Sequence, residues 1–100
     1  MTRGTGKGTR EMATMFVRHT VEDYGKWRST YDAVDSSRTA LGVTAQSVYQ
    51  AAENPNDLTV THDFASLEAA KAFAGSHELH EAMGAAGVVG APTIWFTSRI

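Results

Sequence analysis

The sequence predicts an α+β domain in which four strands form an antiparallel sheet and two helices cover one face, in the chain order β-α-β-β-α-β. Three features of the 100-residue chain lead to this prediction. Two stretches carry apolar residues at helical spacing, and four stretches alternate apolar with polar residues as strands do. Residues 53–57, which are rich in turn formers, separate the second strand from the third.

The composition is that of one globular domain. The chain is 42% apolar, and it contains no apolar run approaching the roughly 18 residues that a membrane-spanning helix needs. We therefore expect no membrane partner. The lack of cysteine excludes disulfides and thiolate chemistry, and it is compatible with the cytoplasm, where we expect the protein to act.

Residues 1–14 differ in charge from the rest of the chain. They hold Arg3, Lys7 and Arg10 against the single acid Glu11, and they lack an apolar run. We expect a flexible tail here, neither signal peptide nor anchor, followed by one domain over residues 15–100. That domain has six basic and ten acidic side chains, and an acidic body argues against a nucleic acid as partner.

Residues 15–20 form the first predicted strand. His19 lies in phase with the apolar residues Met15 and Val17, opposite the set Phe16, Arg18 and Thr20. A histidine on an apolar face belongs either to the core or to a site.

The first predicted helix begins after the N-cap candidate Asp23, runs to about Ala40 and ends at Gly42. Spacings of three and four residues place four side chains on one helical face. They are Tyr24, Trp27, Tyr31 and Val34. An aromatic stripe of this kind usually packs on a broad apolar surface such as a sheet.

Residues 43–51 and 58–64 are the second and third predicted strands, which the turn at residues 53–57 joins as a hairpin. The second strand is polar on both faces, which suggests that one face is partly wet. In the third strand, His62 again lies in phase with apolar neighbours. These neighbours are Leu58, Val60 and Phe64.

The second predicted helix follows the cap candidate Ser66. Its expected buried stripe is Leu67, Ala70, Phe73 and Ala74. Gly75 interrupts the helix, and Ser76 can cap one or two further turns. Residues 84–92 form a predicted link of small residues, and residues 93–98 form the last strand.

Two right-handed crossovers around the central hairpin give the ferredoxin-like arrangement, with both helices on one face of the sheet. The face without helices carries apolar residues and rings, among them Trp95. A surface of this kind is expected to be covered by a partner, and the short chain would gain buried area by pairing with a second copy. The sequence therefore predicts a homodimer.

A set of motifs spread over residues 15–98 resembles a known superfamily. The motifs are His19-x-Val21-x-Asp23-Tyr24-x-x-Trp27-x-x-x-Tyr31-Asp32, Arg38, Gly42-Val43, Asn54-Pro-Asn-Asp57, His62-Asp-Phe64, Ala70-x-x-Phe73 and Ala86-Gly-Val-x-Gly-x-Pro92. Together they resemble the dimeric α/β-barrel superfamily, in particular small bacterial proteins described as cyclase-like or antibiotic-biosynthesis-monooxygenase-like. The resemblance implies a homodimer whose two sheets face each other as a barrel, with a ligand cleft between helices and sheet in each protomer.

The resemblance implies less about the reaction, because the superfamily hosts oxygenases, cyclases, haem-degrading enzymes and proteins without assigned chemistry. Plant polyketide cyclases of this fold use a tyrosine near the position of Phe73, so a tyrosine-dependent reaction is not expected here. The haem-degrading members use an asparagine where this chain has Arg18 and His19. The resemblance therefore favours a reaction that depends on neither a tyrosine at the position of Phe73 nor an asparagine in the first strand.

His19 and His62 fall on neighbouring strands and are the predicted catalytic residues. An imidazole shielded from water has a lowered pKa and can act as a neutral base, which suits proton abstraction from an activated phenol or a β-diketone methylene. In the alternative, each is a core histidine hydrogen-bonded to a backbone carbonyl, to Asp63 or to Tyr31.

The predicted ligand is small and mostly apolar, with an aromatic or polyketide-like character. Its expected contacts are Trp27, Tyr31, Arg38, Phe73, His80 and Met83. The rings would stack on a flat ligand while Arg38 holds an anionic oxygen. In the alternative, the rings are core residues and Arg38 caps its helix or pairs with an acid.

No cofactor or metal is expected. His77 and His80, with Glu81 beside them, match neither zinc signature, and no glycine-rich nucleotide motif follows a strand. The leading hypothesis is thus a cofactor-independent monooxygenase or cyclase. The alternatives are a non-catalytic, ligand-binding or stress-associated dimer and, more remotely, haem or metal handling through His77, His80 or a strand histidine.

Overall fold

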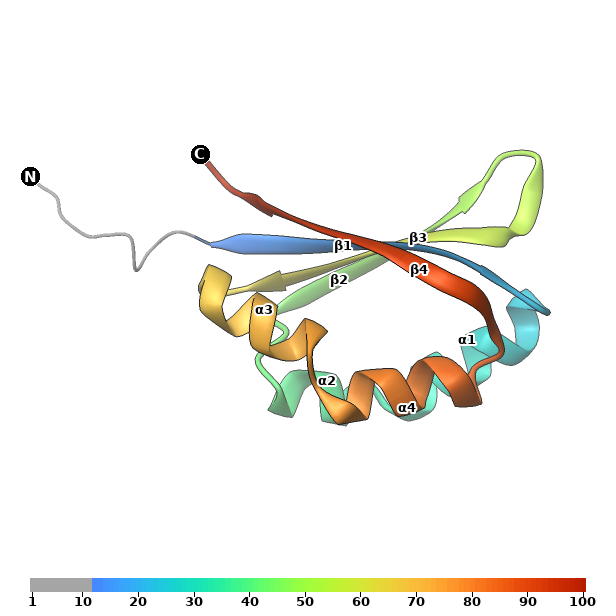
Figure 1. Cartoon of the computed structure of the whole chain (residues 1–100), viewed down its shortest axis with the longest axis horizontal. Coiled ribbons are helices and arrows are strands. Elements are labelled where there is room, and N and C mark those ends of the chain that lie inside the picture. The colour runs from blue at the N-terminus through green and yellow to red at the C-terminus, as the bar shows by residue number, and fades with distance from the viewer. Residues whose placement is uncertain (1–11) are drawn as a thin grey trace, which may run out of the picture.

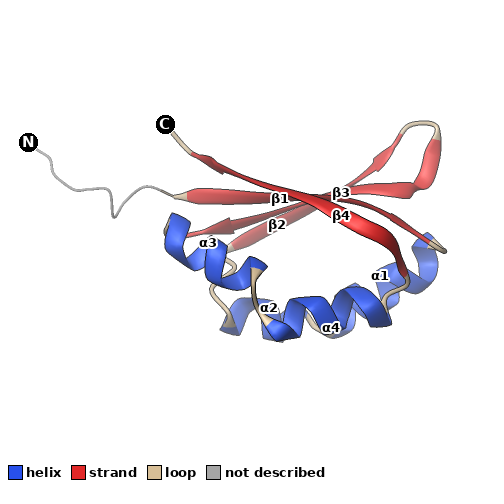
Figure 2. Cartoon of the chain, viewed as in Figure 1, coloured by secondary structure: helices blue, strands red, loops and turns tan. Residues whose placement is uncertain are grey.

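The computed structural model describes residues 12–100 and confirms the predicted α+β, ferredoxin-like architecture (Figure 1). The strands are β1 (Ala13–Val21), β2 (Ala45–Ala51), β3 (Asn54–Phe64) and β4 (Val88–Ser98). The helices are α1 (Tyr24–Ala33), α2 (Asp35–Ala40), α3 (Leu67–Ala74) and α4 (His77–Ala85). Figure 2 shows these helices on one side of the sheet. Among residues 12–100, no helix has the length and apolar character needed to span a bilayer.

The sheet has the strand order β2-β3-β1-β4, with β1 antiparallel to both of its neighbours. In the β1–β3 pair, Met15 lies opposite His62, and His19 lies opposite Leu58. These four side chains are buried. The alternation that placed both histidines on the apolar face of the sheet is therefore confirmed.

The core between sheet and helices consists of two clusters. The first packs around α3 and includes Met15, Val17, Phe64, Ala70 and Phe73. The second packs around α1 and includes Val21, Trp27, Tyr31, Leu58 and Val60. Residues from both clusters line the cavity described below.

The sheet begins before the predicted domain boundary. Residues 1–11 of the predicted tail lie outside the described residues, but Ala13 and Thr14 belong to β1. Ala13 is buried opposite Phe64, and the Thr14 hydroxyl donates a 2.6 Å hydrogen bond to Asp63 Oδ1. Pairing with β3 and β4 therefore extends the strand to residues whose composition does not indicate a strand.

The single helix expected to run to Ala40 is divided. Asp23 caps α1 as predicted, because its side chain accepts a 2.9 Å hydrogen bond from the Lys26 amide. At Val34 the backbone leaves helical geometry, with φ −107° and ψ 20°, and its amide donates to Tyr31 O three residues back. Val34 is β-branched and therefore a weaker helix former. Gly42 follows α2 with a positive φ of 104°, as its predicted role requires.

The hairpin forms, but its turn lies earlier than predicted. Ala51 pairs with Asn54, so the loop is Ala52 and Glu53, and the turn formers of residues 54–57 begin β3. The β2–β3 register shifts between the pairs Gln50–Leu58 and Ala51–Asn54, so residues 55–57 are extra on the β3 side. Within them, Asn56 Oδ1 accepts a 2.8 Å hydrogen bond from the Tyr24 amide at the start of α1.

The predicted link over residues 84–92 is also shorter than expected, because β4 already begins at Val88. The β1–β4 register is irregular opposite His19, between the pairs Arg18–Thr93 and Thr20–Val89. Gly90, with φ 73°, and Pro92 lie in this irregular stretch at the edge of the sheet. Edge strands and bulges are the places where a sheet tolerates proline.

The break between α3 and α4 is confirmed. Ser66 Oγ accepts from the Ala69 amide, and Ser76 Oγ accepts from the Leu79 amide, so each serine caps a separate helix. Ala70 and Phe73 are buried as predicted, whereas Leu67 is exposed.

Replacing Asn56 with alanine is expected to lower the free energy of unfolding by about 1–2 kcal/mol, because the half-buried first amide of α1 loses its acceptor. Urea unfolding followed by circular dichroism measures this loss. Asn56→Asp retains an acceptor oxygen and is the matched control, which should lose much less. Equal losses in the two variants would contradict the assigned role of Asn56 Oδ1.

Candidate functional site

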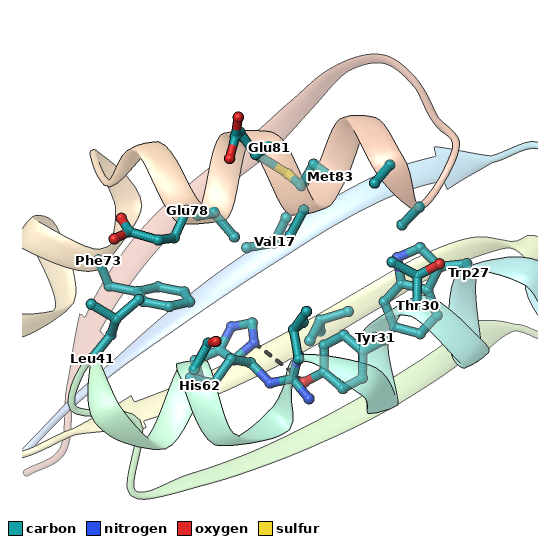
Figure 3. A pocket seen from close by; sticks show the side chains of 18 of the residues that line it. Val17, Trp27, Thr30, Tyr31, Leu41, His62, Phe73, Glu78, Glu81 and Met83 are labelled. Atoms are coloured by element: carbon teal, nitrogen blue, oxygen red, sulfur yellow. Dashed lines mark hydrogen bonds between the residues drawn. The ribbon is translucent and has the colours of Figure 1, made fainter.

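A cavity of about 340 Å³ lies between the helices and the buried face of the sheet (Figure 3). The sheet contributes Val17, His19, Val60 and His62 to its wall. The segment from Trp27 to Leu41 forms a second wall, and α4 forms a third. Its size suits a small organic ligand.

The cavity brings together most of the predicted site residues. Both histidines line it, as do five of the six predicted ligand contacts, Trp27, Tyr31, Arg38, Phe73 and Met83. His80 does not line the cavity and is exposed on α4. The cavity-facing residues of α4 include Leu79, Ala82 and Met83 instead.

His62 is 3% exposed, and its Nε2 lies 3.3 Å from the Tyr31 hydroxyl. Its other ring nitrogen, Nδ1, is buried without a hydrogen-bond partner within residues 12–100. Burial, reinforced by the charge of Arg38, lowers the pKa of His62 to about 4, although Asp63 opposes the shift. His62 is therefore a neutral imidazole near neutral pH.

His19 is 7% exposed, and neither of its ring nitrogens has a hydrogen-bond partner in the described part of the chain. Burial lowers its pKa as well. Its ring lies edge-on to Trp27, with the ring centroids 5.9 Å apart. The Val17–Val60 pair lies between the two histidines in the strand register. The histidines thus share one cavity, and no hydrogen bond among residues 12–100 joins them.

Buried polar atoms without partners are uncommon in folded proteins, since each costs about 1–3 kcal/mol. The core alternative predicted a backbone carbonyl, Asp63 or Tyr31 as partner. Among residues 12–100, only His62 has such a partner, through Nε2 and Tyr31. The three remaining nitrogens belong to residues that line the cavity, and no group among residues 12–100 uses their hydrogen-bonding capacity.

Arg38 is 6% exposed, and its guanidinium lies 3.5 Å from the centroid of the Tyr31 ring. Nε donates a 2.8 Å hydrogen bond to Gln46 Oε1, and Nη2 lies 3.4 Å from the exposed Asp35 carboxylate. The acid pairing expected as an alternative is therefore present but long. Other guanidinium donors remain available for an anionic oxygen of a ligand.

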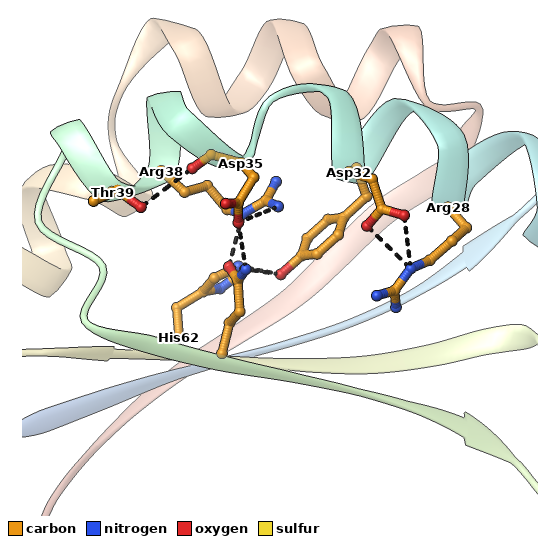
Figure 4. Close-up of polar contacts among 8 residues, drawn as sticks. Arg28, Asp32, Asp35, Arg38, Thr39 and His62 are labelled. Carbon is orange, nitrogen blue, oxygen red and sulfur yellow. Dashed lines mark hydrogen bonds and ion pairs between the residues drawn. The ribbon is translucent and has the colours of Figure 1, made fainter.

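Gln46 is a site residue that the sequence analysis missed. Its Oε1 also accepts a 3.1 Å hydrogen bond from the Tyr31 hydroxyl, and its Nε2 donates a 2.7 Å bond to Asp35 Oδ1. Figure 4 labels the surrounding residues Asp35, Arg38 and His62. Gln46 pairs with His62 across strands β2 and β3. The register of the predicted hairpin was the one signal that could have identified it, because cross-strand partners share a face.

The histidine-rich start of α4 places His77 beside an acidic side chain one turn further along the helix. His77 Nε2 lies 3.2 Å from Glu81, and both side chains are at least 70% exposed. Across residues 12–100, no three potential metal-binding side chains are grouped. Glu78 and Glu81 of this helix are among the residues that line the cavity.

Comparison with solved structures identifies proteins of the same fold. A candidate antibiotic biosynthesis monooxygenase from Bordetella bronchiseptica aligns over 90% of this chain and 98% of its own, with 11% identity and a TM-score of 0.77. A second one, from Caulobacter crescentus, aligns over 92% of both chains, with 16% identity and a TM-score of 0.72.

SnoaB, a cofactor-independent oxygenase from Streptomyces nogalater, aligns over 90% of this chain and 95% of its own, with 13% identity and a TM-score of 0.69. No protein-family model and no curated protein matches the sequence. At these identities the likeness shows the fold, which is that of the antibiotic-biosynthesis-monooxygenase-like structures expected from the sequence.

The lowered pKa of His62 makes the free energy of unfolding depend on pH. Between the ordinary value of 6.5 and the folded value of about 4, the unfolded state binds a proton that the folded state does not. The free energy of unfolding therefore rises with pH across this window and falls on acidification. The full loss is about 3 kcal/mol, since one pKa unit corresponds to about 1.4 kcal/mol.

Urea unfolding across this pH window should show a flatter profile for His62→Gln than for the wild type. His77→Gln, at an exposed position on α4, is the control for replacing a histidine with glutamine. A His62→Gln profile as steep as that of the wild type would contradict the assignment.

Proposed function

We propose that the chain is a cofactor-independent enzyme of the monooxygenase or cyclase type, acting on an aromatic or polyketide-like substrate in the cavity. The observation that carries this proposal is the buried Nδ1 of His62, which has no partner among residues 12–100 in a wall of the cavity. The fold shared with SnoaB, a cofactor-independent oxygenase, supports the same reaction class. The cysteine-free composition suits action in the cytoplasm.

The proposed chemistry begins with proton transfer to an imidazole. A base whose conjugate acid has a pKa of about 4 is weak, so it requires a substrate with an acidic C–H or O–H. Arg38 makes such a transfer easier, because its charge stabilises the phenolate or enolate that forms. The resulting carbanion would attack a carbonyl of the same molecule in a cyclase, or react with dioxygen in an oxygenase.

The cavity walls support a flat, largely apolar substrate. Trp27 and Tyr31 are stacked, with ring centroids 4.6 Å apart. The ring centroids of Phe73 and His62 are 5.3 Å apart. His19 would bind a second polar atom of the substrate, because its unpartnered nitrogens lie four residue pairs away from His62 along β1 and β3. The proposed substrate therefore carries oxygen functions at separated positions.

His62→Gln and His19→Gln are expected to lower turnover of anthrone-like or polyketone substrates by about 10²-fold or more, the range typical for loss of a general base. Product formation and oxygen uptake are measured together, so that cyclisation and oxygenation can be distinguished. His77→Gln is the matched control and should retain activity. Wild-type turnover in both test variants would remove the imidazole mechanism.

One observation also favours a second function, a non-catalytic or stress-associated binding protein. Both nitrogens of His19 lack partners in the described chain, and this would suit ligand binding whether or not a reaction follows. In that case His62→Gln and His19→Gln weaken ligand binding and change the melting temperature. The wild type then converts none of the anthrone-like or polyketone substrates.

The proposal includes a homodimer formed through the sheet face that lacks helices. On that face Phe16 and Trp95 pair across β1 and β4, stacked with centroids 5.2 Å apart. Trp95 is 40% exposed and Tyr49 58% exposed. Rings of this size on an open sheet support burial against a second copy.

Light scattering is expected to give a dimer mass for the wild type at micromolar concentration. Trp95→Glu should shift the mass to that of a monomer, because a carboxylate in a sheet-to-sheet interface loses hydration without gaining a partner. Glu68→Gln, on the helix side of the molecule, is the control and should remain dimeric. A monomeric wild type would contradict the proposed assembly.

A further inference from the structure

We infer that Gln46 is a positioning residue that fixes His62 in the Nε2–H tautomer and so leaves Nδ1 as the basic atom of this histidine. The inference rests on the proposed function for its catalytic meaning. The tautomer itself follows from the hydrogen bonds among Gln46, Tyr31 and His62 and can be measured without a substrate.

The first step is the orientation of the Gln46 amide. One end lies 2.7 Å from Asp35 Oδ1, and a carboxylate oxygen accepts hydrogen bonds. The other end lies 2.8 Å from Arg38 Nε, which only donates. Both contacts are satisfied in one orientation, with Nε2 toward Asp35 and Oε1 toward Arg38.

The second step is the direction of the Tyr31 hydroxyl. Its oxygen lies 3.1 Å from Gln46 Oε1, and an amide oxygen only accepts, so the single hydroxyl proton points toward Gln46. Burial raises the pKa of Tyr31, which keeps this proton in place near neutral pH. On the side that faces His62, the Tyr31 oxygen therefore presents a lone pair and can only accept a hydrogen bond.

The third step concerns the imidazole. His62 Nε2 lies 3.3 Å from the Tyr31 oxygen, which accepts on this side, so Nε2 carries the hydrogen. Because the ring is neutral near neutral pH, as its lowered pKa indicates, it holds no second hydrogen. Nδ1 therefore has a bare lone pair, and it has no hydrogen-bond partner within residues 12–100.

The consequence for the reaction is a defined proton path. When the substrate is deprotonated, its C–H or O–H bond breaks, an N–H bond forms at His62 Nδ1, and the electron pair stays on the substrate anion beside Arg38. The imidazolium that forms keeps its Nε2–H bond to Tyr31. Gln46 touches neither the substrate nor the proton, and it acts through Tyr31.

The test is nitrogen-15 NMR of histidine-labelled protein without substrate, with the His62 signals identified by their loss in His62→Gln. We expect the wild type to show Nε2–H with Nδ1 unprotonated. In Gln46→Leu the Tyr31 hydroxyl loses its acceptor and turns to His62 Nε2, so the Nδ1–H tautomer should become the major form. Gln46→Glu keeps an acceptor and should keep the wild-type tautomer.

Gln50→Leu, on the same strand but exposed, is the matched control and should leave the His62 signals unchanged. If Gln46→Leu does not fold, Tyr31→Phe provides a second variant, which removes the acceptor of Nε2–H and should give a mixture of tautomers. A wild type with Nδ1–H, or a tautomer unaffected in both Gln46→Leu and Tyr31→Phe, would overturn the inference.

Turnover separates this inference from the proposed function. Gln46→Leu should lower turnover by roughly tenfold or more, as expected when a general base is held in the wrong tautomer, and Gln46→Glu should restore much of it. If the tautomers behave as expected while His62→Gln retains full turnover, the catalytic proposal fails and the positioning of His62 by Gln46 is supported.

Discussion

The buried guanidinium of Arg38 is the constraint on which the arrangement of the site depends. A charge that is only 6% exposed must be held by polar partners and by favourable contact with rings. The guanidinium donates a hydrogen bond to the Gln46 oxygen on β2 and lies over the Tyr31 ring of α1. Asp35, on α2 itself, forms an ion pair with it. Three successive elements, α1, α2 and β2, are thereby joined next to His62.

The charge of Arg38 also acts on the protonation of His62, for which burial is the larger cause. Arg38 adds to the effect of burial in lowering the pKa of His62, so the imidazole stays neutral. Gln46 accepts hydrogen bonds from both Arg38 and the Tyr31 hydroxyl, and this hydroxyl contacts the His62 ring. Three buried nitrogens, on His19 and His62, have no partner within residues 12–100. Apolar residues in their place would avoid that cost, so stability alone does not explain these histidines.

The sequence was sufficient to predict features that follow from local pattern, including the faces of His19 and His62 and the caps at Asp23, Ser66 and Ser76. Contacts between distant segments were not predictable in this way. The role of Gln46 depends on the hairpin register, because a strand that is polar on both faces does not indicate which face is buried. His80 was misplaced because it lies about 100° around the helix from Leu79, which faces the cavity.

The central claim is that the cavity binds a ligand whose acidic group meets His62 Nδ1. A crystal structure with an anthrone-like phenol bound tests it most directly. The ligand is expected between the sheet and α4, with an oxygen within hydrogen-bond distance of His62 Nδ1 and a second polar atom near His19. A ligand bound elsewhere, or one that fills the cavity and leaves both histidines without partners, would contradict it.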